Sequence, residues 1–144
     1  MPEPANRTLE TILVVDDDPA VLKVVVKILE AEDFLVLSAA SAAAGLKIAR
    51  EAEGPINMLL SDVDLAEMSG PDLGEAMKKI RPTLHVMLMS GGGNGNLLVL
   101  NYGWAYIQKP LLAEKLVQMI EEVLHSKNRS QLGGQEFDSS KDTK

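Results

Sequence analysis

Apolar and polar residues follow two alternating patterns along most of the chain. Short, mostly apolar runs are typical of buried β-strands, and they cover about residues 11–16, 34–37, 56–61, 86–89 and 105–108. The stretches between them place apolar residues at helical spacing, as Val21, Val25 and Leu29 do after the first run. Strands that alternate with helices predict βαβ units, in which the strands of one sheet run parallel.

Capping residues and prolines mark the expected helix boundaries. Asp18-Pro19 predicts the start of the first helix, and Ser41 predicts the start of a second that reaches about Glu51. Gly70-Pro71 opens a third helix, and Pro82 ends it. A last helix is expected over about residues 112–125.

The alternation predicts an α/β fold, namely a flavodoxin-like (βα)5 doubly wound parallel sheet with strand order 2-1-3-4-5. The glycine cluster over residues 91–96 replaces the start of the fourth helix. Because each glycine costs a helix roughly 1 kcal/mol relative to alanine, we expect this helix to be shortened or missing. One domain is expected over residues 10–126, after a disordered segment over 1–9 and before a disordered polar tail over 127–144.

Composition and charge exclude several classes of function. The chain has 144 residues, of which 46% are hydrophobic, so one domain with a buried core is expected. It has no cysteine, which excludes disulfides, thiolate metal sites and a cysteine nucleophile. A net charge of −7 argues against direct nucleic-acid binding, which needs a basic face. No apolar run is long enough for a membrane span or a signal peptide, so a cytoplasmic location is expected.

Polar residues gather where the predicted strands end. Asp16 and Asp17 follow the first strand, Asp62 the third, Ser90 the fourth and Lys109 the fifth. The carboxyl ends of parallel strands lie on one rim, where ligands bind at the switch point between the first and third strands. Carboxylates gathered there repel one another unless a cation binds, and oxygen ligands suit Mg²⁺. A lysine and a hydroxyl suit a phosphoryl group, and a carboxylate can be its acceptor. These arguments leave open which aspartate that is.

Four segments resemble the response-regulator receiver family of two-component signalling. They are Ile12 to Pro19 (ILVVDDDP), Leu60 to Gly70 (LSDVDLAEMSG), Ser90-Gly91 and Tyr106 to Pro110 (YIQKP). They occur in the family's order, and the resemblance covers about residues 10–125.

The resemblance implies a role for each of seven residues. Asp62 would accept the phosphoryl group, Ser90 would be the switch hydroxyl, and Lys109 would contact the phosphate. Asp16, Asp17 and Asp62 would hold Mg²⁺, with Asp17 the more direct ligand of the acidic pair and the backbone carbonyl of Asp64 a further ligand. Tyr106 would be the aromatic residue that changes rotamer on activation, although a partly buried core tyrosine is an equally good interpretation.

The chain departs from the family pattern in three ways. Ala66 stands where the family usually has proline, which we expect to loosen the loop after Asp62 without affecting the chemistry. Only 18 residues separate Ser90 from Lys109, a few fewer than usual. The third departure is the glycine cluster over residues 91–96, and because such a segment can hold little ordered structure, we expect an order–disorder response over residues 91–103 in place of a rigid shift of the fourth helix.

The sequence thus predicts a phosphoacceptor of a phosphorelay that is not a turnover enzyme. A histidine kinase or phosphotransfer protein would supply the phosphoryl group, and a downstream protein would receive the signal. One alternative is a pseudo-receiver, an interaction scaffold that is never phosphorylated. Another is a small phosphatase or phosphotransferase with a D-x-D pair, which Asp16 and Asp18 would supply.

Overall fold

The computed structural model describes residues 9–91 and 102–125. Within these residues, five strands alternate with four helices. Their bounds are β1 (Thr11–Val15), α1 (Pro19–Ala31), β2 (Leu35–Ala39), α2 (Ala42–Glu51), β3 (Met58–Asp62), α3 (Gly70–Ile80), β4 (His85–Ser90), β5 (Ala105–Gln108) and α5 (Ala113–Leu124). The expectations for the two disordered ends and for the fourth helix fall on residues 1–8, 92–101 and 126–144, which lie outside the described residues.

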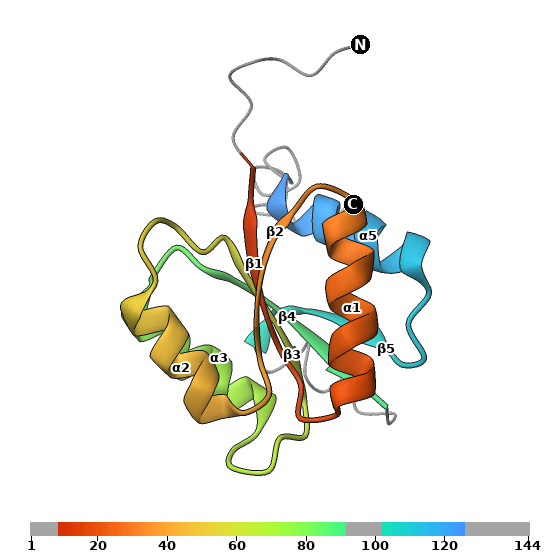
Figure 1. Cartoon of the computed structure of the whole chain (residues 1–144). Coiled ribbons are helices and arrows are strands. Elements are labelled where there is room, and N and C mark those ends of the chain that lie inside the picture. Colours follow the sequence, from red (N-terminus) through yellow and green to blue (C-terminus); the bar gives the residue numbers. More distant parts are fainter. Residues whose placement is uncertain (1–8, 92–101, 126–144) are drawn as a thin grey trace, which may run out of the picture.

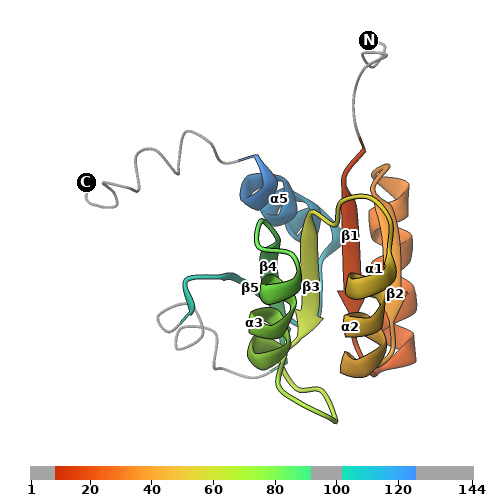
Figure 2. The same ribbon diagram turned by 90° about the vertical axis from the view of Figure 1, so that its left-hand side faces the viewer.

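The strands form one parallel sheet in the order β2-β1-β3-β4-β5, which confirms the predicted topology. Figure 2 shows the strands side by side between the helices, with the carboxyl ends of β1 and β3 at the same edge of the sheet. Val15 pairs with Ser61, so the residues that follow them, Asp16 and Asp62, are neighbours at this edge. The switch point in strand order therefore lies where the acidic residues are.

Helices cover both faces of the sheet, with α1 and α5 on one side and α2 and α3 on the other (Figure 1). Successive residues of the central strands point to opposite faces. Ile12 and Leu60 accordingly pack with residues of α1 and α5, while Leu13 and Leu59 pack with residues of α2 and α3. This explains why β1 and β3 are apolar at consecutive rather than alternate positions, over residues 12–15 and 58–60.

Side-chain caps fix where the helices begin. The Asp18 carboxylate accepts from the Ala20 N–H, and the Ser41 hydroxyl accepts from the Ala44 N–H, as the sequence predicts. The hydroxyl of Ser69 does the same for α3 through the Asp72 N–H.

The strand bounds differ from the predicted ones mainly at β2, which begins one residue later and ends two residues later than expected, and at β3. Ile56 is buried, but it precedes the strand. The strand begins at Met58 and extends to Asp62, because Asp62 still pairs with Met89 of β4. An apolar pattern shows burial, whereas the strand bound depends on pairing with a neighbour.

Two contacts fix α3 against its surroundings. The Arg81 guanidinium donates to the carbonyl oxygens of Ala49, Ala52 and Gly54, which joins the end of α3 to the end of α2. Trp104, just before β5, packs so closely on Gly74 that a Cβ there would lie 2.8 Å from the indole. Helix α3 is thus joined to α2 and to the residue that precedes β5.

Candidate functional site

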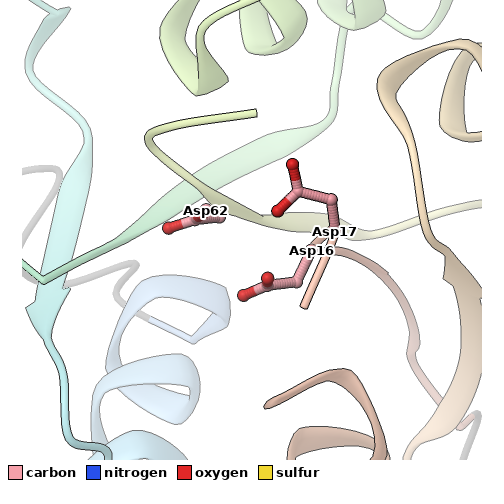
Figure 3. A group of neighbouring side chains, drawn as sticks. All are labelled: Asp16, Asp17 and Asp62. Atoms are coloured by element: carbon pink, nitrogen blue, oxygen red, sulfur yellow. The ribbon is translucent and has the colours of Figure 1, made fainter. Parts of the chain in front are cut away.

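Three carboxylates meet at the carboxyl edge of the sheet. Asp16 and Asp17 follow β1, and Asp62 ends the neighbouring strand β3. Each offers one oxygen, and these three oxygens all lie within 4.8 Å of one another. Figure 3 shows the three side chains converging from two strands, with one Asp17 oxygen turned toward the other two carboxylates. The structure thus brings together the three carboxylates that the sequence predicts to hold a metal.

Lys109 supplies the positive charge of this cluster. Its Nζ lies 3.1 Å from Oδ2 of Asp16 and 3.1 Å from Oδ1 of Asp62. The backbone N–H of Lys109 donates to the carbonyl of Ser90 over 2.8 Å, which holds the start of the following loop beside β4. Lys109, which follows β5, therefore bridges the carboxylates of Asp16 and Asp62.

Burial and charge shift the pKa values of Asp62 and Lys109. Burial raises the pKa of the Asp62 carboxyl, the contact with Lys109 opposes this rise, and the charges of Asp16 and Asp64 add to it. Burial lowers the pKa of Lys109, but hydrogen bonds to Asp16 and Asp62 outweigh it, so that this pKa is raised overall. The lysine stays protonated, yet one lysine does not fully compensate the buried carboxylates. A further cation bound at the site would compensate the remaining negative charge.

Asp16 and Asp17 differ in how many of their carboxylate oxygens are engaged in hydrogen bonds. Asp16 is completely buried, and its Oδ1 accepts from the Asp18 N–H while its Oδ2 contacts Lys109. Asp17 is exposed, and its Oδ2 accepts from the Ala66 N–H over 3.1 Å. Within the described residues, no hydrogen bond engages the other Asp17 oxygen. Asp17 is therefore the member of the pair with an oxygen left for a cation.

The loop between β3 and α3 approaches Asp62 closely. The N–H of Gly70 donates to the carbonyl of Val63 over 2.7 Å, and Asp64 forms a bridge with Ser69. A Cβ at position 70 would lie 2.2 Å from the carbonyl oxygen of Asp62, so only glycine fits there. Asp64 lies in this loop with its side chain exposed. The role of its carbonyl as a metal ligand stays a prediction.

Ser90 and Tyr106 lie on neighbouring strands. Ser90 ends β4, is buried and pairs with Gln108, whereas Tyr106 is half-buried and pairs with Leu88. Residues two apart on a strand share a face, so both side chains stand on the side of the sheet covered by α2 and α3. A coupling between Ser90 and Tyr106 needs both side chains on the same face of the sheet. Their roles as switch residues stay predictions.

Sequence reasoning missed two contacts of the loop after Asp62. It expected Ala66 to loosen the loop without affecting the chemistry and did not foresee that the Ala66 N–H contacts Asp17. The Glu67 carboxylate accepts from the Ala43 N–H at the start of α2. A backbone donor leaves no signal in a residue pattern, so these contacts need the fold to be seen.

Asp18 bears on the D-x-D interpretation. Its carboxylate accepts from the Ala20 N–H, and it is not part of the cluster formed by Asp16, Asp17 and Asp62. The residue serves as a helix cap in this structure.

Comparison with known proteins identifies the fold and the family. Residues 12–121 match the family description of the response regulator receiver domain. The chain belongs to this family. It is therefore a receiver domain of two-component systems, with the CheY-like fold of its structural neighbours.

Three relatives illustrate the match. A CheY-like receiver domain protein from Methanospirillum hungatei JF-1 is 34% identical with a TM-score of 0.75, and the match covers 85% of this chain and 99% of that one. The sensor kinase CckA of Brucella abortus (strain 2308) is 28% identical over 82% of this receiver, which spans 13% of that protein. The transcriptional regulatory protein GlrR of Escherichia coli (strain K12) is 28% identical over 78% of the receiver, which spans 26% of it. The receiver thus corresponds to a small part of both curated relatives.

The donor set of this receiver fits the Mg²⁺ that receiver domains generally bind. It consists only of carboxylate oxygens, which a hard divalent cation prefers, and one of them is exposed. Among the helices of residues 9–91 and 102–125, none is both long and apolar enough to cross a bilayer.

Proposed function

We propose that this receiver accepts a phosphoryl group on Asp62 in a reaction that depends on Mg²⁺. The donor is the phosphohistidine of a histidine kinase or of a phosphotransfer protein. An Asp62 oxygen attacks phosphorus as the bond from phosphorus to the imidazole nitrogen breaks, which gives an aspartyl phosphate and a free histidine. The product is a modified protein that changes its affinity for a downstream protein.

The observation that carries this proposal is the contact of Lys109 with both Asp16 and Asp62, at 3.1 Å each. Oδ1 of Asp62 contacts the lysine, and among the described residues no hydrogen bond engages the second oxygen. The second oxygen is therefore available as the nucleophile. Lys109 is placed to leave Oδ1 and to contact the oxygens of the incoming phosphoryl group, where negative charge gathers.

The metal would be held by Asp17 together with Asp16 and Asp62. When bound, Mg²⁺ neutralises phosphoryl oxygens and so reduces their repulsion from the attacking carboxylate. Asp16 keeps Lys109 in place through its Oδ2, while its Oδ1 stays on the Asp18 N–H. The acidic residues therefore have different tasks, even though all three are aspartates.

The donor protein would dock on an apolar groove beside the site. Val21 and Val24 of α1 line it together with Leu111 and with Lys109 itself. Val24 is 53% exposed, so this groove presents an apolar side chain to solvent. Because Lys109 belongs both to the groove and to the acidic site, a protein bound there would present its phosphohistidine next to Asp62.

Phosphorylation is tested with acetyl phosphate and Mg²⁺. Intact mass should show one labile phosphate adduct on the wild type and none on Asp62→Asn. Asp72→Asn is the matched control, because it makes the same change at an exposed carboxylate of α3 that is not part of the acidic cluster; it should label like the wild type. Full labelling of Asp62→Asn would refute the assignment. No adduct on any of the three proteins would identify a pseudo-receiver.

Docking is tested with a phosphorylated histidine phosphotransfer protein that labels the wild type. Val24→Glu should slow this transfer at least tenfold, since a charge placed in an apolar contact costs about 1.4 kcal/mol or more. Labelling by acetyl phosphate should not change. Leu35→Glu is the control, because Leu35 is 50% exposed but begins β2 at the opposite edge of the sheet. Equal rates for the two variants would rule out this groove as the docking site.

The proposal includes two further points. The receiver is modified once per cycle and does not turn over substrate as an enzyme does, although it can lose its phosphoryl group to water. It works in the cytoplasm, through contacts with proteins and without direct binding to nucleic acid. A net charge of −7 is consistent with the last point.

A further inference from the structure

The backbone N–H of Ala66 makes a contact that reaches across the site. It donates to Oδ2 of Asp17 over 3.1 Å, and so joins the loop after β3 to the loop after β1. The two residues are 49 positions apart in the sequence. A backbone N–H that donates to a carboxylate is a charge-assisted hydrogen bond, which is stronger than one between neutral groups.

The loop that carries Ala66 is held at three other points. Glu67 accepts from the Ala43 N–H at the start of α2, the Gly70 N–H donates to Val63, and Asp64 forms a bridge with Ser69. These contacts fix the direction of the Ala66 N–H without any help from Asp17. The N–H is therefore a fixed donor that sets the position of the carboxylate.

Asp16 does not depend on this loop. Its Oδ1 accepts from the N–H of Asp18, two residues along the same chain segment, and its Oδ2 contacts Lys109. Asp17 is exposed, and Ala66 is the only donor that the described residues offer to its carboxylate. Without this donor, Asp17 has the rotamer freedom of a surface side chain.

We propose that Ala66 is a positioning residue, whose N–H holds one Asp17 oxygen so that the other is directed at the cation. Figure 3 shows the two oxygens turned in different directions, one toward Asp16 and Asp62 and one away from them. A donor on one oxygen does not compete with a cation on the other, and it fixes the carboxylate as outer hydrogen bonds fix metal ligands elsewhere. The inference rests on the proposed Mg²⁺ site and makes metal affinity depend on the loop after β3.

Substitution at position 66 can remove the donor while the side chain stays small. Proline, the residue that the family usually has at this position, has no N–H, so the proposed hold on Asp17 is particular to this chain; glycine and serine keep the N–H. Mg²⁺ binding is measured by calorimetry on the full chain, without any phosphodonor. We expect Ala66→Pro to weaken Mg²⁺ binding about tenfold, the effect typical of losing an outer hydrogen bond to a metal ligand. Ala66→Gly and Ala66→Ser should stay within about twofold of the wild type.

The glycine and proline variants separate this inference from a simple effect of loop stiffness. If stiffness controlled the affinity, proline would strengthen Mg²⁺ binding and glycine would weaken it, and that result would overturn the inference. Unchanged affinity in Ala66→Pro would overturn it too, while leaving the proposed function intact. If the wild type binds no Mg²⁺, both this inference and the proposed function are wrong.

A second measurement does not need the proline variant to fold. The exchange of the Ala66 amide proton with solvent is followed by NMR in the wild type and in Asp17→Ala. We expect slow exchange in the wild type, with and without Mg²⁺, and at least tenfold faster exchange in Asp17→Ala. Equal exchange in the two proteins, or loss of protection when Mg²⁺ is added, would show that the N–H does not hold Asp17 in the loaded site.

Discussion

Lys109 balances a charge that water cannot reach. Asp16 is 0% exposed, and its only ion pair within the described residues is with Lys109, whose side chain is 21% exposed. A buried ion pair adds little net stability, because desolvation offsets the attraction between the charges. Removing one partner, however, leaves an uncompensated buried charge. The lysine is thus a structural counter-ion in addition to the phosphate-contacting role proposed above.

Lys109→Ala should lower the free energy of unfolding by about 3 kcal/mol in metal-free buffer, the low end of the range for a broken buried pair. Mg²⁺ should recover much of this loss, because a cation that binds only the folded state compensates the same carboxylates. Urea unfolding with EDTA and with Mg²⁺ measures both. Lys115→Ala, an exposed lysine on α5, is the control and should change stability by less than about 0.5 kcal/mol. Equal stability of Lys109→Ala and the wild type in EDTA would show that Asp16 does not need this counter-ion.

For single residues, the sequence predicts well which side chains meet in the acidic cluster. Asp16, Asp62 and Lys109 each follow an apolar strand, and strands of a parallel sheet must bring such positions to one edge. The sequence could not predict which carboxylate oxygens of Asp16 and Asp17 accept a hydrogen bond and which one is left for a cation. They depend on the N–H groups of Asp18 and Ala66, whose directions arise only from the folded backbone.

The element that controls the geometry of Asp62 is the turn into α3. The helix begins at Gly70, and this residue lies against the backbone of the strand end that carries Asp62. Any larger residue would push the start of the helix away from β3. The position of Asp62 therefore depends on a residue with no side chain.

Gly70→Ala should lower the free energy of unfolding by about 1–3 kcal/mol or more, because its Cβ would lie 2.2 Å from the Asp62 carbonyl oxygen. It should also slow labelling by acetyl phosphate. Gly91→Ala provides the control: in the part of the chain that the structure describes, no atom beyond its own chain neighbours lies within 4 Å of the Cβ it would add. Denaturant unfolding and the labelling rate measure both variants. Similar values for the two would mean that the turn adapts freely.

Helices and strands were predicted to within a few residues where a cap or a proline marks them. Ser41 and Asp18 give α2 and α1 their starts, and Gly70-Pro71 gives α3 its start. The bounds of β3 were less predictable, since pairing with β4 rather than apolarity decides where the strand ends.

For the molecule as a whole, the sheet separates two regions with different electrostatics. The acidic site lies at the carboxyl edge, and His85 starts β4 at the opposite edge. Burial lowers the pKa of His85, the nearby charge of Lys78 lowers it further, and Glu10 partly opposes this. Strand order was predictable, because the alternation of strands and helices and the right-handed crossovers between parallel strands allow few topologies. The charged groups around His85 were not predictable.

The shift at His85 makes stability depend on pH. A histidine whose pKa is lower in the folded state than the ordinary 6.5 stabilises the fold above that pH, and this contribution is lost as the pH falls below it. His85→Gln should therefore lose less stability than the wild type between pH 7 and pH 5. Thermal unfolding in EDTA at several pH values provides the comparison. Asp62 acts in the opposite direction, because its raised pKa reduces stability as the pH rises, but it is present in both proteins. Parallel pH profiles for the two proteins would contradict this assignment.

The packing of Trp104 gives the protein an optical reporter of its own. It is the single tryptophan in the chain, it lies against Gly74 and packs on the core between the sheet and helices α2 and α3, and its ring stacks on Tyr102 with centroids 4.9 Å apart. Indole emission shifts to longer wavelength when water replaces such neighbours, so one fluorescence signal reports on the junction between α3 and β5. Lys109 follows that same strand. Events at the acidic edge that disturb β5 can therefore be timed in a stopped-flow instrument on the unlabelled protein.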